Sequence, residues 1–213
     1  IKPSTKNWGL LRLPNYLFRP SNIDPLHFDL WKGGENILRD GGSFSYNTNV
    51  ELFDFFFGLK SHNTVDFKGS ESMPKISKFL CSNWLKFRNY KISENDDYLS
   101  CQSEYKFKDC LHNRKVQSDK NGINWIISDY IENNKKKSVL RWRLIPSKWY
   151  MFGNKICSDK FDIFIETNND NFSLEIKEEW ESRFYNQMNK VPVILVNINS
   201  KYIQIKTHIK FKS

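Results

Sequence analysis

Side chains that could bind an acidic ligand or move protons gather between residues 22 and 63 of this sequence. They are Asn22, Asp24, Arg39, Asp40, Tyr46, His62 and Asn63. Tyrosine and histidine suit proton transfer, while asparagine, histidine and arginine suit the neutralisation of a carboxylate. The sequence therefore offers Arg39, Tyr46, His62 and Asn63 as candidates for lining a substrate cleft.

The elements that must position these side chains have the pattern of a β-hairpin. Apolar residues alternate with polar ones at Leu26, Phe28, Leu30 and Ile37, which is the period of a half-buried strand. A glycine pair, residues 33–34, supplies the backbone freedom of a tight turn between the two runs. The candidate side chains follow the ends of these strands, where sites are usually built on a β scaffold.

The rest of the chain has the pattern of further strands. They are expected near residues 8–13, 61–67, 98–111, 123–131, 138–144, 149–152, 161–167, 172–180, 193–198 and 202–212. Residues 48–60 are a short helix or a buried aromatic run, and residues 76–90 are mostly extended or irregular. Many short strands separated by turn signals predict an all-β antiparallel sandwich of two stacked sheets. We expect residues 1–213 to form one such domain.

The composition of the chain limits the kinds of partner that it is expected to bind. The 213 residues carry a net charge of +9 and 17 phenylalanines, which allows a packed core and favours either an anionic partner or simply a lysine-rich solvated surface. No nucleic-acid-binding signature and no apolar run long enough for a transmembrane helix is present, so neither a nucleic-acid partner nor a membrane span is expected. The spacing of the four cysteines does not indicate a zinc site, and free thiols are the expectation.

Three stretches together resemble the C-terminal β domain of heparinase II/III-like polysaccharide lyases of bacterial surface-polysaccharide metabolism. They are Asp24 with the HFDLW run, residues 37–46 (ILRDGGSFSY) and residues 61–65 (SHNTV). A sparser similarity continues at residues 180–185 and at Thr207. The order and spacing of these stretches carry the resemblance.

The resemblance implies a function and a partner domain. Lyases of this family cleave acidic, uronic-acid-containing polysaccharides by β-elimination, in a cleft between the β domain and a preceding helical toroid that supplies catalytic residues. The chain would then be the C-terminal part of a longer protein, inactive as a lyase alone, and located in the periplasm or cell envelope. The alternative is a non-catalytic carbohydrate-binding or scaffolding module in the same metabolism.

The resemblance also implies a metal position. Some family members hold a structural zinc with two histidines and one aspartate, and Asp40 and His62 match two of these ligands. Asn22 stands where the first histidine would be, and zinc prefers nitrogen and sulfur ligands from His and Cys. The alternative is that Asp40 and His62 hydrogen-bond each other and brace the strand ends.

Other residues have weaker assignments. No histidine stands near Arg19 and Pro20, where the family has a catalytic one, so Arg19 or His27 would have to replace it. The parity of His27 in its strand differs from that of the apolar face, which places it on the solvent side or toward the second sheet, with a polar partner as the alternative to catalysis. Further candidates for anion contacts, beside Arg39, are Arg141, Arg143 and Lys148, and those for stacking on sugar rings are Trp31, Trp149 and Tyr46. The alternative for both sets is ordinary sheet surface. His112 and His208 have no predicted role.

Overall fold

The structure is a computed structural model that describes residues 1–133, 135 and 137–212. It is 54% strand and 5% helix, which confirms the all-β class. The strands are β1 Asn7–Leu11, β2 Phe28–Lys32, β3 Glu35–Leu38, β4 Val65–Phe67, β5 Lys75–Ser77, β6 Leu80–Cys81, β7 Phe87–Glu94, β8 Tyr98–Phe107, β9 Cys110–Asp119, β10 Asn124–Asn133, β11 Ser138–Arg143, β12 Tyr150–Phe152, β13 Lys155–Cys157, β14 Phe161–Thr167, β15 Phe172–Glu181, β16 Asn189–Ile198 and β17 Tyr202–Phe211. The helices are α1 Val50–Phe57 and the 3-10 turn η1 Leu59–Ser61.

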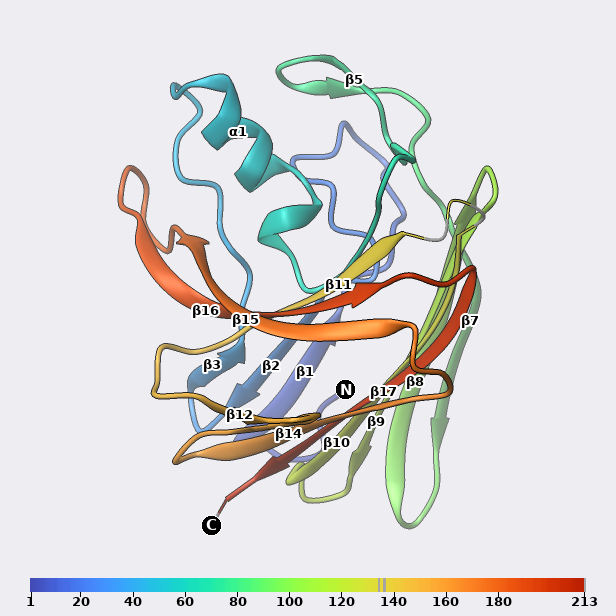
Figure 1. Cartoon of the computed structure of the whole chain (residues 1–213), viewed down its shortest axis with the longest axis vertical. Coiled ribbons are helices and arrows are strands. Elements are labelled where there is room, and N and C mark those ends of the chain that lie inside the picture. Colours follow the sequence, from blue (N-terminus) through green and yellow to red (C-terminus); the bar gives the residue numbers. More distant parts are fainter. Residues whose placement is uncertain (134, 136, 213) are drawn as a thin grey trace.

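One layer of the sandwich is an eight-stranded sheet in the order β12-β13-β14-β17-β10-β9-β8-β7 (Figure 1). The facing layer consists of two separate sheets, β1-β2-β3 and β15-β16-β11-β4. Phe28 of β2 contacts Trp125 of β10 at 6.0 Å between ring centroids, and the Trp142 indole of β11 donates a hydrogen bond to Thr207 of β17. Both smaller sheets therefore pack against the large one, and the predicted antiparallel sandwich is confirmed.

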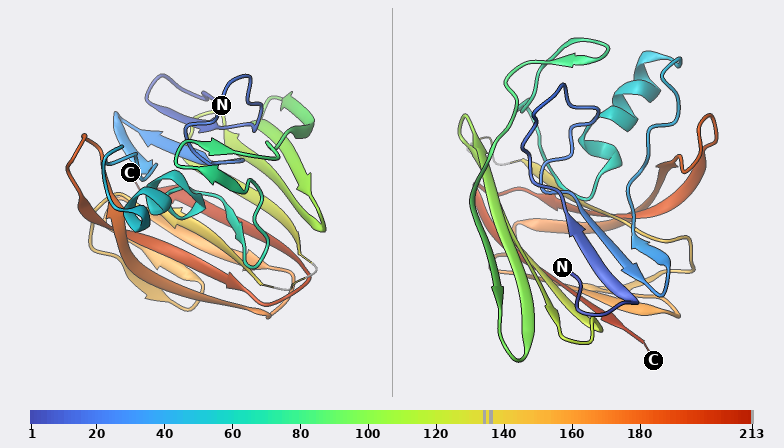
Figure 2. Two further views of the ribbon diagram at one scale, coloured as in Figure 1. Left: turned by 90° about the horizontal axis from the view of Figure 1, so that it is seen from above. Right: turned by 180° about the vertical axis from the view of Figure 1, so that it is seen from behind.

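The two ends of the sandwich differ. Figures 1 and 2 show α1, the β5–β6 hairpin and the long segment between β1 and β2 at one end, with the β7–β8 and β9–β10 turns at the other. We call the first of these the loop end. Arg39, Asp40 and Tyr46 follow β3, whereas His62 and Asn63 follow η1 and precede β4, so the candidate residues come from both sides of strands and not only from strand ends.

Residues 48–60 were expected to be either a short helix or a buried aromatic run, and both descriptions apply. Residues 50–57 form α1, and one side of this helix is buried. The side chain of Asn49 caps the helix by accepting a hydrogen bond of 2.9 Å from the N–H of Leu52. Phe53, Phe56 and Phe57 face the protein interior. The apolar side of α1 therefore covers part of the protein interior at the loop end.

Three predicted strand boundaries were wrong. Leu26 has φ +53° and lies in a turn before β2, although its side chain is fully buried as predicted. Within residues 61–67 only β4 is a strand, because Ser61 still belongs to the 3-10 turn η1 and residues 62–64 are bent. The predicted strand at residues 98–111 is broken by a turn at Lys108, which has φ +49°, so that β8 and β9 form a hairpin of two ten-residue strands.

Candidate functional site

Asn63 lies at the centre of the segments that carry the candidate residues. Its side-chain amide donates hydrogen bonds to the carbonyl oxygens of Phe28 at 2.9 Å and Arg39 at 3.1 Å. Its side-chain oxygen accepts a hydrogen bond of 2.6 Å from the N–H of Arg143. Asn63 is fully buried, so it joins β2, the end of β3 and β11 instead of facing a substrate.

Arg39 and Tyr46 lie in different environments. Arg39 is buried, with Nε 2.9 Å from Glu181 Oε1, and burial raises the pKa of Glu181 to about 7. Tyr46 is 59% exposed and its ring lies beside the rings of Phe79 and Tyr185. Of the four cleft candidates, only Tyr46 presents its side chain to solvent, because His62 is fully buried as well.

Several hydrogen-bond donors and cations surround the Asp40 carboxylate. His62 Nδ1 lies 3.1 Å from Asp40 Oδ2, and the N–H of Gly42 donates to Oδ1 at 2.7 Å. The Arg12 guanidinium lies 3.5 Å from Oδ2 and 2.5 Å from the Asp24 carboxylate. Burial alone would raise the pKa of Asp40, but His62 and His27 outweigh it and hold that pKa far below its usual range. The predicted hydrogen bond between Asp40 and His62 is confirmed.

His27 belongs to this same cluster, and its burial excludes the solvent side as its location. The side chain is fully buried, because Leu26 turns the chain before β2 and directs the ring inward. Its Nδ1 accepts a hydrogen bond of 2.9 Å from the N–H of Asn63. Its Nε2 lies 3.4 Å from Asp29 Oδ1 and 3.7 Å from Asp40 Oδ2. His27 therefore has the polar partner that the sequence offered as the alternative to catalysis.

A second buried network supports the same segments from the large sheet. Arg114 pairs with Asp129 at 2.7 Å, and Nη1 of Arg114 donates to the carbonyl oxygens of Leu26 and Asn63 at 2.6 and 2.7 Å. His112 also contacts Asp129, at 2.7 Å. The sequence did not single out this network. Its only signal is that residues 112 and 114 have the same parity in β9 as the buried Val116.

Comparison with known families decides what kind of domain this is. The family described as "Heparinase II/III-like, C-terminal" matches residues 13–206, which is most of the chain. The chain belongs to the heparinase II/III-like family. No curated protein matches the sequence.

Solved structures share the fold of this heparinase II/III-like domain. The heparinase III described as the BT4657 gene product superposes with a TM-score of 0.77 at 16% identity, over 96% of this chain and 32% of that one. A heparan sulfate lyase, HepC from Pedobacter heparinus, gives a TM-score of 0.70 at 18% identity, over 89% of this chain and 31% of that one. The chain thus spans about a third of the length of these structures.

The residues present in this heparinase II/III-like domain do not fit the zinc that the family resemblance implies. One potential ligand atom from each of His27, Asp40 and His62 lies within 4.8 Å of the others, so His27 and not Asn22 completes the trio. A neutral imidazole has one acceptor nitrogen, and in His27 that nitrogen already accepts from Asn63. The other nitrogen then carries the proton and cannot bind a metal. Arg12 also supplies positive charge to Asp40, as a metal would.

We therefore expect the purified protein to contain far less than one zinc ion per chain. Added zinc should leave the melting temperature unchanged, because within this trio only Asp40 and His62 offer free ligand atoms and structural zinc takes four ligands. Mass spectrometry of the metal content and thermal unfolding with and without a chelator would measure this. Stoichiometric zinc that survives dialysis and disappears in the His62→Ala variant would contradict it.

Several predicted anion and sugar contacts are instead internal contacts of the heparinase II/III-like domain. Arg143 is fully buried and pairs with Glu179 at 3.0 Å, and Arg141 is 5% exposed and pairs with Asp66 at 3.3 Å. Every residue of β11 is buried, so neither face of the strand is available to an external ligand. Among the stacking candidates, Trp31 stacks on Trp8 and Trp149 packs against Phe161, while Lys148 is exposed.

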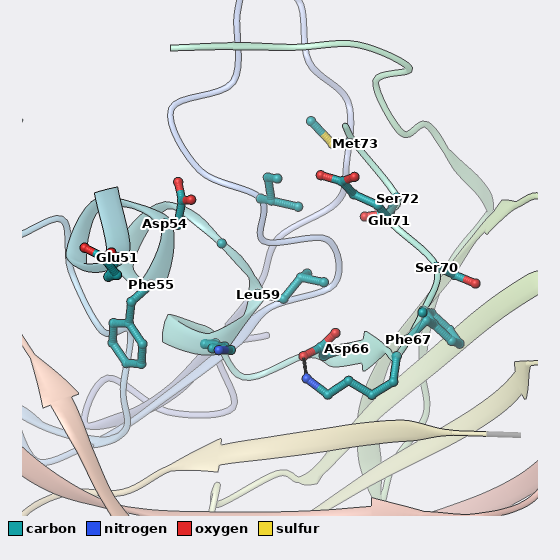
Figure 3. Close-up of a pocket in the computed structure, with 15 residues that line it drawn as sticks. Glu51, Asp54, Phe55, Leu59, Asp66, Phe67, Ser70, Glu71, Ser72 and Met73 are labelled. Carbon is teal, nitrogen blue, oxygen red and sulfur yellow. Dashed lines mark hydrogen bonds and ion pairs between the residues drawn. The ribbon is translucent and has the colours of Figure 1, made fainter. Parts of the chain in front are cut away.

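A cavity of about 680 Å³ opens beside α1, away from the Asp40 cluster (Figure 3). Carboxylates line it from α1, from β4 and from the segment after β4; two lysines, Lys60 and Lys68, also line it, and Lys68 pairs with Asp66. The carboxylates are Glu51, Asp54, Asp66 and Glu71. Because like charges repel, this cavity is poorly suited to an acidic polysaccharide. In the part of the chain that is described, no helix is long and apolar enough to span a membrane.

Proposed function

We propose that this chain is the β-sandwich part of a polysaccharide lyase that acts by β-elimination on an acidic, uronic-acid-containing polysaccharide. Its part would be to bind the polysaccharide at the loop end, against a helical domain of the same protein. The observation that carries the proposal is a group of exposed rings at the loop end. Tyr46 and Tyr185 are each 59% exposed, and the Tyr185 hydroxyl lies 3.2 Å from the Ser45 hydroxyl. Exposed aromatic rings offer flat apolar faces with a polar edge, which suits sugar rings.

Because His27 and His62 are buried, neither is placed to act as the base of the reaction. A general base must come within hydrogen-bond reach of the proton that it removes. His27 and His62 are fully buried beneath the loop end and contact Asp40. The proposal therefore gives neither histidine a proton-transfer role and gives the exposed Tyr46 a sugar contact. It places the acid and the base of the β-elimination in the helical domain, so the chain would have no lyase activity alone.

The same observation favours a second candidate function. A domain whose titratable cluster is buried and internally paired could serve as a non-catalytic module that binds or organises a surface polysaccharide. The two candidates share the binding surface and differ only in whether the complete protein cleaves. In either case we propose a periplasmic or cell-envelope location, where such polysaccharides are met.

The test of the proposal has a binding arm and a cleavage arm. We expect the chain to bind uronic-acid-containing polysaccharides in calorimetry, more weakly as salt increases, and not to bind a neutral glucan. The complete protein should generate the ultraviolet absorbance of an unsaturated uronate from one of a panel of such polysaccharides. Binding without any absorbance increase would favour the non-catalytic module. Absence of binding and of cleavage would contradict both.

A further inference from the structure

A small cavity at the loop end combines aromatic walls with a guanidinium group. It measures about 410 Å³, within the range of about 300 to 1,000 Å³ that is usual for small-molecule sites. Its lining comes from four separate segments: the β1–β2 connection, the residues after β3, helix α1 and the β5–β6 turn. The cavity is distinct from the acidic one beside α1.

The floor of the cavity is apolar and ordered by ring contacts. Phe53 and Phe57 on α1 stack at 5.4 Å and are each 7% exposed. Phe79 stands at 5.5 Å from Phe53 in an edge-to-face arrangement and is 38% exposed, and Tyr46 lies 6.1 Å from Phe79. Two of the rings, Phe79 and Tyr46, are therefore available to contact a ligand that enters.

The charges around the cavity are positive. The Arg19 guanidinium lies 5.9 Å from the centre of the Phe79 ring and, among the described residues, forms no ion pair with a carboxylate. Lys78 lies 5.8 Å from the same ring and 5.4 Å from that of Phe53. A guanidinium held beside an aromatic wall can bind an anionic group while the ring contacts the apolar body of the same ligand.

We propose that this cavity is a subsite for one pyranose unit that carries an anionic substituent. Arg19 holds the anion by a bidentate contact, and Phe79 and Tyr46 contact the sugar ring. The inference rests on the proposed function, and it assigns recognition of the anion to one residue instead of to the net positive charge of the chain. Carboxylate and sulfate share this chemistry, so the ligand panel must separate them.

The experiment is calorimetry of the whole chain with three matched oligosaccharides: a non-sulfated uronate oligosaccharide, its sulfated counterpart and a neutral one of equal length. Arg19→Gln should weaken binding of the preferred anionic ligand about 10- to 100-fold, the loss expected for one charge-assisted contact. Phe79→Leu should also weaken it, whereas Arg19→Lys should lose less than Arg19→Gln. Lys91→Gln, which removes the same charge from an exposed position on β7, should bind like the unchanged chain.

The outcomes separate the inference from the function on which it rests. If the unchanged chain binds and Arg19→Gln binds equally well, the subsite is wrong while the proposed function stands. The subsite is also wrong if Arg19→Gln and Lys91→Gln lose affinity equally, because binding would then depend on net charge. If the unchanged chain binds none of the anionic ligands, the proposed binding function fails, and the subsite with it. Thermal unfolding of each variant verifies that the fold is retained.

Discussion

Replacing Asp129 by asparagine is expected to lower the free energy of unfolding by about 3 to 5 kcal/mol. Arg114 and Asp129 are both buried in the large sheet and paired at 2.7 Å. Burial alone would raise the pKa of Asp129, but Arg114 and His112 lower it, so the carboxylate is charged in the folded protein. Without that charge the guanidinium stays buried without a counter-ion, which costs much more than the pair itself contributes.

The measurement is urea unfolding of the chain at neutral pH. Glu166→Gln is the matched control, because Glu166 pairs with His208 at 3.0 Å on the exposed side of the same sheet, where solvent screens the pair and its loss should change stability little. The double change Arg114→Met with Asp129→Leu should recover much of the loss, since it removes both charges at once. If the single Asp129→Asn variant is as stable as the Glu166→Gln control, the Arg114–Asp129 pair does not stabilise the folded protein.

Replacing Asp40 by asparagine is the second large change, and its effect should depend on pH. The pKa of Asp40 is lowered in the folded protein relative to its ordinary value of 3.8, so its charged form favours folding. This contribution is complete above about pH 4 and is lost as pH falls from 3.8 through the lower folded pKa. We expect the variant to be less stable by about 3 kcal/mol at pH 7 and the difference to shrink in acid.

Urea unfolding of both chains between pH 7 and pH 2.5 would follow this difference. Asp96→Asn, at an exposed position in the β7–β8 turn, is the control and should show no such dependence. A difference between the unchanged chain and Asp40→Asn that stays constant from pH 7 to pH 2.5 would mean that Asp40 acts through shape and not through charge.

Local chemistry explains which parts of the fold were predictable. Gly33 and Gly34 have φ of +57° and +86°, a conformation that favours glycine, so the sequence shows the β2–β3 turn directly. The β8–β9 turn contains Lys108 in a similar conformation, and lysine is not a turn signal. The alternating pattern on both sides of it therefore has the form of one continuous strand.

The sequence predicted which residues belong to the site, but not which of them are buried and structural. The order of the motifs identified Asp40, His62 and Asn63, and the hydrogen bond between the first two is present. The burial of Asn63 could not be predicted, because its partners Arg114 and Arg143 come from strands far along the chain. The same holds for His27, whose inward direction depends on the single left-handed residue that precedes it.

The hydrogen bonds of Arg114 and Arg143 with residues 26 and 63 join groups that are 88, 51 and 80 positions apart in the chain. During synthesis, residues 22–67 are made before either arginine. Their buried carbonyl and amide groups then have no permanent partner, and contacts between residues so distant in sequence form slowly. We therefore expect the stretch that the family resemblance identifies first to reach its native arrangement among the last parts of the chain.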